Sequence, residues 1–543
     1  MAKLPRSIPD RHIYLSYRMG LLEDAGLENF SSILGCKLQQ APKILYRALN
    51  KATKTNEKIY GMRKNAINIM SKFTNEKHDA FEEIFDRLSV LETDLDNFIL
   101  PESDDTKDMQ TDALGQLSFQ EESFKGLNYV PFILYAMVLF KVWAVPAMAI
   151  LTPVIAWILP YIFLKFMVNL PISTDQYNEI MGLVWSGNIV PSLNKTAAKP
   201  SKYNMRSMIQ MLFMGISFIQ SLVQPIQNAL HLNKIDKTLY KNGEQIIEVA
   251  KLYSRLQDEC KKEKILFLFT NSLKSIPLND PRIAIMSVLE HPELFRLALK
   301  DLAKLEIVWR ISRSPYLRMA QVIEKGAYPL FSAHNFFDLS LGFDAVPSSV
   351  NFSAMSPHAA LTGPNGGGKS SFLRGILQCV VLSHTYGFAP ADNLIIRRFS
   401  WISSGLRLQD VPGNLSMFET EVWFASNLLR YNTENRVGLV LYDELFHSTN
   451  PPDGIRTAEL FLKQLWKKTG IISIVSTHVF ELVEKAPPEV QRLCCSAAEL
   501  PSGDIQYSYS VEEGICKISS VKDIWKRFEL DQTPAPPRSK QPL

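Results

Sequence analysis

Residues 361–372 read L-T-G-P-N-G-G-G-K-S-S-F, and this stretch decides the fold of the C-terminal part of the chain. They fit the pattern G-x-x-x-x-G-K-[ST], with Gly363, Gly368, Lys369 and Ser370 at its fixed positions. Glycines let such a loop point its backbone N–H groups inward around phosphate oxygens, because no Cβ stands in the way. The lysine adds a mobile cation, and the serine hydroxyl is a ligand that Mg²⁺ accepts. The stretch therefore predicts a phosphate-binding loop.

The residues on both sides of the loop fit this prediction. Residues 359–361, Ala-Ala-Leu, form the expected end of a strand, and the apolar run F-L-R-G-I-L-Q-C-V-V-L after the loop predicts a helix. The N-terminal end of such a helix faces the phosphates with the positive end of its dipole. The expected nucleotide contacts are the successive residues Gly363, Pro364, Asn365, Gly366, Gly367, Gly368, Lys369, Ser370 and Ser371.

A second strand further along the chain ends in two carboxylates. Residues 438–445, G-L-V-L-Y-D-E-L, predict a buried strand followed by Asp443 and Glu444, which is the Walker B pattern. Asp443 is expected to hold Mg²⁺ together with the Ser370 hydroxyl, and Glu444 is expected to orient and deprotonate an attacking water. These residues predict ATP and Mg²⁺ as cofactors.

A third strand supplies a candidate imidazole. Residues 471–478, I-I-S-I-V-S-T-H, end at His478, which is expected to reach the γ-phosphate or the attacking water. A lone histidine at a strand end is usually structural, but its place in this series of strands favours a functional role. The candidate catalytic residues are therefore Glu444, His478 and Lys369.

Four motifs, taken in order, resemble those of the MutS mismatch-repair ATPases. The phosphate loop is similar to the family's T-G-P-N-M-G-G-K-S, and residues 413–421, G-N-L-S-M-F-E-T-E, resemble its S-x-F-x-x-E segment. Residues 443–454, D-E-L-F-H-S-T-N-P-P-D-G, resemble the family's passage from Walker B into a D-loop, and S-T-H-V-F-E-L resembles its A-T-H-Y-F-E-L. The resemblance covers about residues 330–520, roughly a third of the chain.

The resemblance implies an α/β P-loop NTPase domain of the ABC-ATPase type that works as a head-to-tail pair. Ser416 of one chain is then expected to reach the nucleotide of its partner, in a homodimer or a MutS-like heterodimer. DNA is an expected partner of the family, but nothing N-terminal resembles its mismatch-reading domain. The family's V-P-N-D segment near the adenine is Val346-Pro347-Ser348-Ser349 here, which leaves the base contacts open.

The middle of the chain is unusually apolar. From residue 126 to 164 the only charge is Lys141, and the run is long enough for one tilted membrane helix or a tight hairpin of two. The candidate spans are 129–165 and the weaker stretch 208–226, which a buried helix of a soluble protein explains equally well. Together with the D-loop, these segments make the chain most similar to the membrane-associated MutS-like ATPases of giant DNA viruses and microbes. We expect a membrane-associated protein with its ATPase domain on the cytoplasmic side.

The pattern of the whole chain predicts several regions. Amphipathic periodicity over residues 38–50 and 76–98 predicts helices, with Phe81, Ile84, Leu88, Leu91 and Leu95 on one buried stripe of the second. The expected layout is a helical N-terminal region (1–100), an acidic linker (101–120), a candidate membrane region (121–227), a helical connector (228–325), the ATPase domain (326–520) and a C-terminal tail with a disordered end (521–543).

Composition leaves other functions open. The net charge of +4 over 543 residues gives no support for strong nonspecific binding of nucleic acid, and the six scattered cysteines predict reduced thiols. One alternative is a soluble mismatch-repair or recombination factor with the apolar segments in its core. A second is an ABC-transporter-related ATPase, which would carry an L-S-G-G-Q signature where this chain has G-N-L-S-M-F. A third, a catalytically silent scaffold, conflicts with the intact candidate residues.

Overall fold

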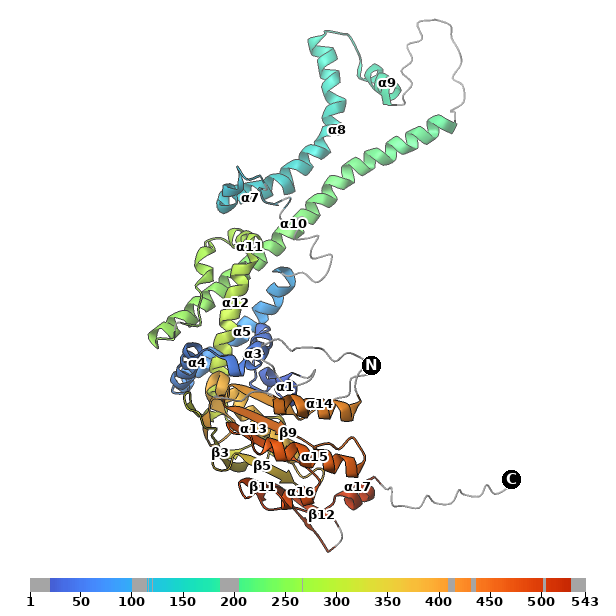
Figure 1. Ribbon diagram of the computed structural model, residues 1–543. Coiled ribbons are helices and arrows are strands. Elements are labelled where there is room, and N and C mark those ends of the chain that lie inside the picture. Colours follow the sequence, from blue (N-terminus) through green and yellow to red (C-terminus); the bar gives the residue numbers. More distant parts are fainter. Residues whose placement is uncertain are drawn as a thin grey trace, which may run out of the picture. The chain divides into compact units, whose positions relative to one another are not determined.

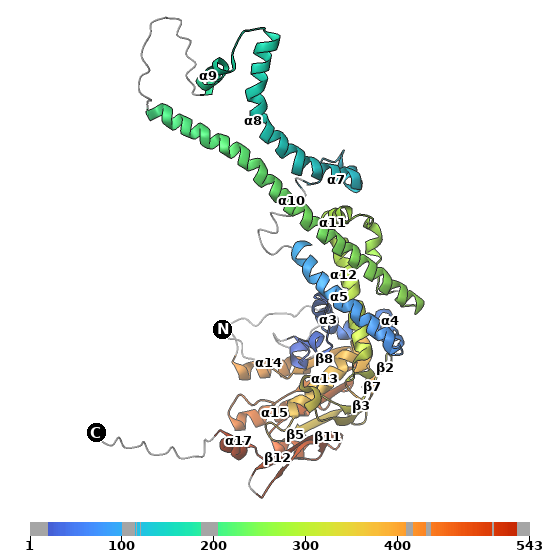
Figure 2. The ribbon, with the colours of Figure 1, turned by 180° about the vertical axis from the view of Figure 1, so that it is seen from behind.

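The computed structural model describes residues 20–99, 115, 117–119, 121–185, 205–265, 267–408, 416–430, 436–501 and 504–528. The chain divides into two compact units (Figures 1 and 2). Unit 1 comprises residues 1–86, 260–268 and 300–543, and unit 2 comprises residues 87–259 and 269–299. Most of the expected acidic linker and the end of the tail, from residue 529, lie outside the described residues. The domain limits drawn from the sequence therefore stay predictions.

The core of unit 1 is a six-stranded sheet with strand order β12-β11-β5-β10-β9-β8. Strands β8, β9, β10, β5 and β11 are parallel, and only β12 pairs antiparallel with its neighbour β11. Every residue of β5, β8, β9 and β10 is buried, as expected for parallel strands with both faces covered. The strands are β5 (His358–Thr362), β8 (Trp401–Gly405), β9 (Gly438–Tyr442), β10 (Ile471–Ser476), β11 (Val490–Glu499) and β12 (Ile505–Glu513).

Smaller sheets and further helices complete this α/β part. A four-stranded sheet has the order β2-β7-β3-β4, and β1 pairs with β6. The strands are β1 (Arg318–Met319), β2 (Gln321–Ile323), β3 (Phe331–Phe336), β4 (Ser348–Phe352), β6 (Phe388–Ala389) and β7 (Asn393–Arg397). The helices are η6 (Leu339–Asp344), α13 (Lys369–Tyr386), α14 (Met417–Arg430), α15 (Pro451–Leu465), α16 (Phe480–Glu484) and α17 (Val521–Arg527). The prediction of an α/β domain after a mainly helical region is confirmed.

A helical layer covers α13, the helix that follows the phosphate loop. Helices α1, α3, η1 and α4 all contact α13, so that most of its residues are buried between this layer and the sheet (Figure 1). Asn56 starts α4 by accepting hydrogen bonds from Lys58 N (2.9 Å) and Ile59 N (3.4 Å), which caps two otherwise unpaired donors. The helices are α1 (Leu21–Ala25), α2 (Phe30–Ile33), α3 (Gln40–Leu49), η1 (Ala52–Lys54), α4 (Glu57–Met70), α5 (Asn75–Ile99) and α12 (Pro292–Arg313).

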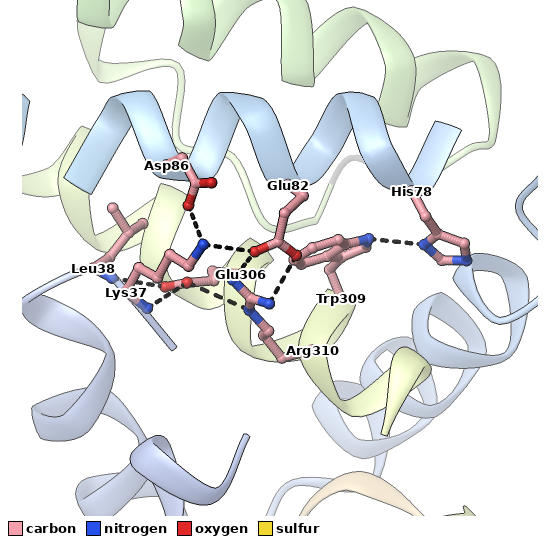
Figure 3. A network of polar contacts seen from close by, with 8 residues as sticks. All are labelled: Lys37, Leu38, His78, Glu82, Asp86, Glu306, Trp309 and Arg310. Atoms are coloured by element: carbon pink, nitrogen blue, oxygen red, sulfur yellow. Dashed lines mark hydrogen bonds and ion pairs between the residues drawn. The ribbon is translucent and has the colours of Figure 1, made fainter. Parts of the chain in front are cut away.

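A buried carboxylate fastens this layer to α12 (Figure 3). Glu306 is fully buried and accepts hydrogen bonds from the backbone N–H groups of Lys37 (2.6 Å) and Leu38 (3.0 Å). Arg310 makes a bidentate pair with Glu82 of α5 at 2.9 and 2.8 Å, and Lys37 pairs with Glu82 and Asp86. Burial raises the pKa of Glu306 and the two backbone donors lower it, because they stabilise its charged form.

The aromatic core beside this network confirms the predicted stripe on α5. Trp309 is fully buried, donates from its indole nitrogen to His78 Nδ1 at 3.0 Å, and lies against the rings of Phe81 and Phe85. Figure 3 shows His78 and Trp309 at the end of the polar network. All five predicted positions of the stripe are buried: Phe81, Ile84, Leu88, Leu91 and Leu95.

Unit 2 contains the apolar segment as one helical run. Helix α7, a π-helical turn, α8 and a second π-helical turn follow one another from Pro131 to Met167 without a hairpin. Its most apolar window has a mean hydropathy of 2.1 and none of it is buried. By length and composition it is the one helix in the described part of the chain that is able to cross a membrane. Pro153 and Pro160 lie inside α8, and the two π-helical turns lie directly before and after this helix.

The second candidate span lies within the long helix α10 (Met205–Lys262). Several side chains of residues 208–226 lie outside the described part, so this span remains a prediction. The other elements of unit 2 are η2 (Lys125–Tyr129), α7 (Pro131–Leu139), η3 (Phe140–Ala144), α8 (Val145–Ile162), η4 (Phe163–Met167), α9 (Thr174–Trp185), η5 (Ser272–Ser275) and α11 (Pro281–Glu290).

Candidate functional site

The predicted phosphate-binding loop connects β5 to α13. Gly363 and Gly368 have φ angles of 143° and 100°, which a residue with a side chain rarely adopts, and Gly368 directly precedes the helix. Lys369 is 5% exposed and its ammonium donates to the carbonyls of Gly363 (3.0 Å) and Pro364 (3.1 Å). Burial lowers the pKa of Lys369, and the carboxylates of Asp443 and Glu444 oppose that shift. A cation therefore lies within the loop, beside the N-terminus of a long helix.

The ends of three elements meet at Asp443. Ser370, in the first turn of α13, donates its hydroxyl to Asp443 Oδ2 at 2.5 Å, and Ser476 at the end of β10 donates to Oδ1. Strands β9 and β10 are adjacent and parallel, so their carboxyl ends lie at the same edge of the sheet as the loop after β5. A hydroxyl beside a carboxylate suits a hard cation such as Mg²⁺, which usually keeps several waters and phosphate oxygens as its other ligands. The structure thus brings together the two predicted metal ligands.

Glu444 lies in a left-handed backbone conformation directly after Asp443. Its φ angle is 52°, and its backbone N–H donates to the Ser476 hydroxyl at 2.8 Å. Its carboxylate lies 3.9 Å from His478 Nε2, and this neighbouring imidazole makes the largest contribution to the lowered pKa of Glu444. A carboxylate that stays ionised near neutral pH is able to accept a proton from water. The structure brings Glu444 and His478, two of the three predicted catalytic residues, next to each other and beside the loop that contains the third, Lys369.

A cavity of about 550 Å³ lies over the loop. Its lining includes Glu444 and several loop residues, together with Val346 and Ser348 of the V-P-S-S segment. The sequence motifs did not predict the residues that form the remaining walls of this cavity. These are formed by η6 and its flanks, by β3 and by Tyr509 of β12, and they include Phe336, Phe337, Asp338, Leu341, Asp344 and Tyr509.

Tyr509 reaches the loop because β12 is the edge strand beyond β11, which itself pairs with β5. It has a φ angle of 57°, next to an irregularity in the pairing of the two strands. A Cβ placed on Gly368 would lie 3.7 Å from the Tyr509 ring, so the loop and this side chain are in contact distance. No spacing in the sequence pointed to this residue; only the strand order places it at the site.

Ser416 stands at the start of α14, where it forms a reciprocal cap with Glu419. The Ser416 hydroxyl and backbone N–H both donate to the Glu419 carboxylate, at 3.0 and 2.9 Å, and Glu419 N donates back to the hydroxyl at 3.3 Å. Ser416 does not belong to the described residues that line the cavity of its own chain. This placement leaves its predicted action on a partner's nucleotide untested.

Glu421 connects α14 to the segment after β9. Its side chain is 1% exposed, accepts a hydrogen bond from Ser448 Oγ at 2.7 Å and pairs with His447 Nδ1 at 3.1 Å. His447 Nδ1 also lies 2.9 Å from the carbonyl of Glu444. Burial raises the pKa of Glu421, and Ser448 and His447 offset part of that effect. Helix α14, which follows Ser416, is therefore linked to the candidate water-activating Glu444 through the buried carboxylate of Glu421 and the imidazole of His447.

Comparison with known proteins assigns this region to a family. A protein-family model described as "MutS domain V" matches residues 359–526, from β5 to α17. Two curated relatives, the DNA mismatch repair proteins MutS of Streptococcus pyogenes serotype M5 (strain Manfredo) and serotype M49 (strain NZ131), are each 26% identical over 171 residues. The similar part covers 31% of this chain and 20% of each relative, so the chain matches about a fifth of their length. Residues 359–526 are therefore a domain V of the MutS family.

Proposed function

We propose that this chain binds and hydrolyses ATP at the carboxyl ends of β5, β9 and β10. The observation that carries the proposal is the meeting of the Lys369 ammonium, the Ser370–Asp443 pair and the Glu444 carboxylate beside one cavity of about 550 Å³. Cavities that hold small ligands have volumes of about 300–1,000 Å³, so a nucleotide suits this one. The loop residues Gly363 to Ser371 supply backbone N–H groups and glycine conformations suited to a triphosphate.

In the proposed reaction Lys369 stabilises charge on the β- and γ-phosphates. Ser370 and Asp443 would hold Mg²⁺, and the ion would supply positive charge to offset part of the phosphate charge. The Glu444 carboxylate accepts a proton from water while the water oxygen bonds to the γ-phosphorus, and the bond between that phosphorus and the bridging oxygen breaks to leave ADP and phosphate. His478, 3.9 Å from Glu444, keeps that carboxylate ionised and oriented.

We further propose that two chains complete each site. Ser416 caps α14 away from the cavity of its own chain, which supports an action on the nucleotide of a partner in a homodimer or a MutS-like heterodimer. ATP bound between two chains would hold the dimer closed, and hydrolysis would release it. Glu421 of α14 contacts Ser448 and His447, and His447 contacts the carbonyl of Glu444. Through these contacts, closure of the dimer would change the position of Glu444 relative to the reacting water.

We also propose that this dimeric clamp is attached to a membrane, with the ATPase domain on the cytoplasmic side. The run from Pro131 to Met167 supports it, because its apolar window is unburied and a soluble core helix of that composition would be covered. The relatives are named DNA mismatch repair proteins, which makes a soluble DNA repair factor the second candidate. Partition of the full-length chain into buffer rather than detergent would favour that second candidate.

Steady-state ATP hydrolysis by the detergent-purified chain tests the proposal. We expect Mg²⁺-dependent release of phosphate by the parent, and a loss of about 100-fold or more in Glu444→Gln, because removal of a general base commonly costs 10²–10⁴-fold. Glu444→Gln should still bind ATP, whereas Lys369→Ala should bind it weakly. The exposed Lys467→Ala is the control and should behave as the parent does. Phosphate release by Glu444→Gln at the parent's rate would refute the assignment of the base.

A further inference from the structure

The helical layer over α13 carries an unusual concentration of positive charge. Residues 38–75 contain eight lysines and arginines and a single carboxylate, Glu57, whereas the net charge of the whole chain is only +4. The cations are Lys43, Arg47, Lys51, Lys54, Lys58, Arg63, Lys64 and Lys72. The small net charge of the chain therefore conceals a strongly basic segment, and the rest of the chain is acidic on balance.

These cations fall into two groups: some contact the rest of the domain, and the others are exposed to solvent. Arg63 and Lys64 face inward, where Arg63 Nη1 donates to the carbonyl of Thr385 (3.4 Å) and Lys64 Nζ to that of Ala320 (2.8 Å). Arg63 also lies over the ring of Tyr386, near the C-terminal end of α13, where a cation is favoured. These two residues fasten α4 to the ATPase domain and are not available to a partner.

The other cations are exposed, and all of them except Lys72, which follows the end of α4, belong to residues 43–58. Ala41, Leu45 and Leu49 of α3 and Ala52 of η1 are buried, and these two elements and α4 all contact α13. Residues three or four positions apart share one face of a helix, so the opposite face of α3 points away from the domain. We define the basic face as the exposed side chains of Lys43, Tyr46, Arg47, Lys51, Lys54 and Lys58.

The composition of the basic face favours a nucleic acid over a lipid surface. A helix that inserts into a membrane surface needs an exposed apolar stripe, but the apolar stripe of α3 is buried, which leaves electrostatic attraction as the only way for this face to bind lipid. What remains exposed is a row of cations with one aromatic ring, Tyr46, which is 44% exposed between Lys43 and Arg47, and with one carboxylate, Glu57, next to Lys58. Cations along a phosphate backbone with an interleaved aromatic ring are the equipment of sequence-independent nucleic-acid binding. The Tyr46 hydroxyl donates to the Glu23 carboxylate at 3.4 Å, so a carboxylate lies beside this ring.

We propose that the basic face of α3, η1 and α4 binds the phosphate backbone of DNA. The face lies on helices that contact α13, and α13 starts at Lys369 of the phosphate loop. A ligand on this face is therefore one helix away from the nucleotide site. The coupling of DNA to hydrolysis rests on the proposed ATPase function, whereas the binding itself does not.

The test compares DNA binding by three full-length proteins in detergent. The first is the parent, and the second carries Lys43→Gln, Arg47→Gln, Lys51→Gln and Lys58→Gln. The third is a control that loses the same charge from scattered exposed positions: Lys241→Gln, Lys467→Gln, Lys485→Gln and Lys522→Gln. Fluorescence anisotropy with a labelled 40-base-pair duplex is recorded over a range of salt concentrations. Mixed micelles of the same detergent with phosphatidylserine serve as the competing polyanion, because detergent would dissolve vesicles.

We expect the quadruple variant of the basic face to bind the duplex at least ten-fold more weakly than the parent and the control. Its slope of log affinity against log salt should be shallower by about 2–3, since each lost phosphate contact removes about 0.9. Equal binding by all three proteins, or no binding by the parent, would overturn the proposal. A loss of binding to the phosphatidylserine micelles without a loss of DNA binding would also overturn it and would assign the face to lipid.

The two proposals fail separately. All three proteins should keep the same basal ATP hydrolysis without DNA, which also shows that the variants fold. A parent that hydrolyses ATP but does not bind DNA would refute only the proposed DNA binding by the basic face. A parent that binds DNA through this face but has no ATPase activity would sink only the proposed reaction.

Discussion

Gly363 is the residue at which the chain leaves β5 and starts the candidate phosphate loop. Its φ angle is 143°, and a Cβ placed there would lie 3.0 Å from the Cβ of Cys495. Gly363→Ala should therefore strain the loop, and we expect a loss of about 1–3 kcal/mol in the free energy of unfolding. ATP binding should weaken as well, because the first N–H groups of the loop would be displaced. Urea denaturation and nucleotide titration measure the two effects.

The control for this substitution is Gly61→Ala. Gly61 lies inside α4 with open space around its Cβ position, so an alanine should stabilise the protein by about 0.5–1 kcal/mol. Equal stability of Gly363→Ala and the parent would contradict the steric argument.

Asp24 gives the stability of unit 1 a pH dependence. It is 2% exposed, and burial raises its pKa from 3.8 to about 6, although Ser404 and Arg407 offset part of the effect. A carboxyl with a raised pKa stabilises the fold in its protonated form, so its contribution is complete below about pH 4 and is lost as the pH rises through about 6. We expect the free energy of unfolding of Asp24→Asn to fall less than that of the parent between pH 4 and 7.

Urea denaturation across this pH range checks the prediction, with Asp79→Asn as a control at an exposed position of α5. The same fall in the parent and in Asp24→Asn would show that this carboxyl does not titrate with a raised pKa.

At the scale of residues, the sequence predicted one side of the site and missed the other. Lys369, Ser370 and Asp443 belong to motifs whose spacing follows from the chemistry of a phosphate and a metal ion, and the structure brings them together. Phe336 and Tyr509 reach the same cavity from β3 and β12, which lie in different sheets. Their positions depend on strand order and on one irregularity in strand pairing, and neither leaves a short-range pattern in the sequence.

At the scale of elements, α12 is held to the N-terminal helices through Glu306. Its removal in Glu306→Ala leaves the N–H groups of Lys37 and Leu38 without their acceptor and takes a partner from Arg310. Each buried donor left unpaired costs about 1–3 kcal/mol, so for the two donors we expect a total loss of about 2–6 kcal/mol in the free energy of unfolding. Thermal denaturation should show a clear fall in Tm.

Lys37→Ala is the matched control because it removes only the side chain, which pairs with Glu82 and Asp86 near the surface. Exposed ion pairs contribute about 0–1 kcal/mol, so its effect should be small. A larger effect of Lys37→Ala than of Glu306→Ala would contradict the assignment of the network's strength to the buried carboxylate.

Helical periodicity was enough to predict α3 and α5 and the buried stripe of α5, because both helices bury one face. It was not enough for the run from Pro131 to Met167, where apolar residues occur on all sides and no face is specified. A tilted helix and a hairpin fit such a sequence equally well, and the structure has the continuous helix. Periodicity also could not show that the layer of α1, α3 and α4 lies on α13, since that contact joins residues more than 300 positions apart.

At the scale of the whole molecule, the exposed apolar helix predicts attachment to a lipid bilayer. Leu151→Lys together with Ile155→Lys places two charges near the middle of the run, at positions that are each 52% exposed. A charge at the centre of a spanning helix costs about 2.5–3.5 kcal/mol, so we expect the double variant to separate from liposomes. Flotation of the purified chain with liposomes through a sucrose gradient is the measurement.

Leu230→Lys is the control, because Leu230 is 65% exposed on α10 outside both candidate spans. It should float with the liposomes as the parent does. A parent chain that stays at the bottom of the gradient would contradict membrane attachment and favour the soluble repair factor.

In the proposed clamp two chains share each ATP, with Lys369 from one and Ser416 from the other. The most direct test mixes a Lys369→Ala chain with a Ser416→Ala chain, each of which should be almost inactive alone. A mixed dimer has one intact site and one doubly damaged site, so an equal mixture should regain about a quarter of the parent's ATP hydrolysis per chain. A mixture no more active than the sum of its two components would contradict the shared site.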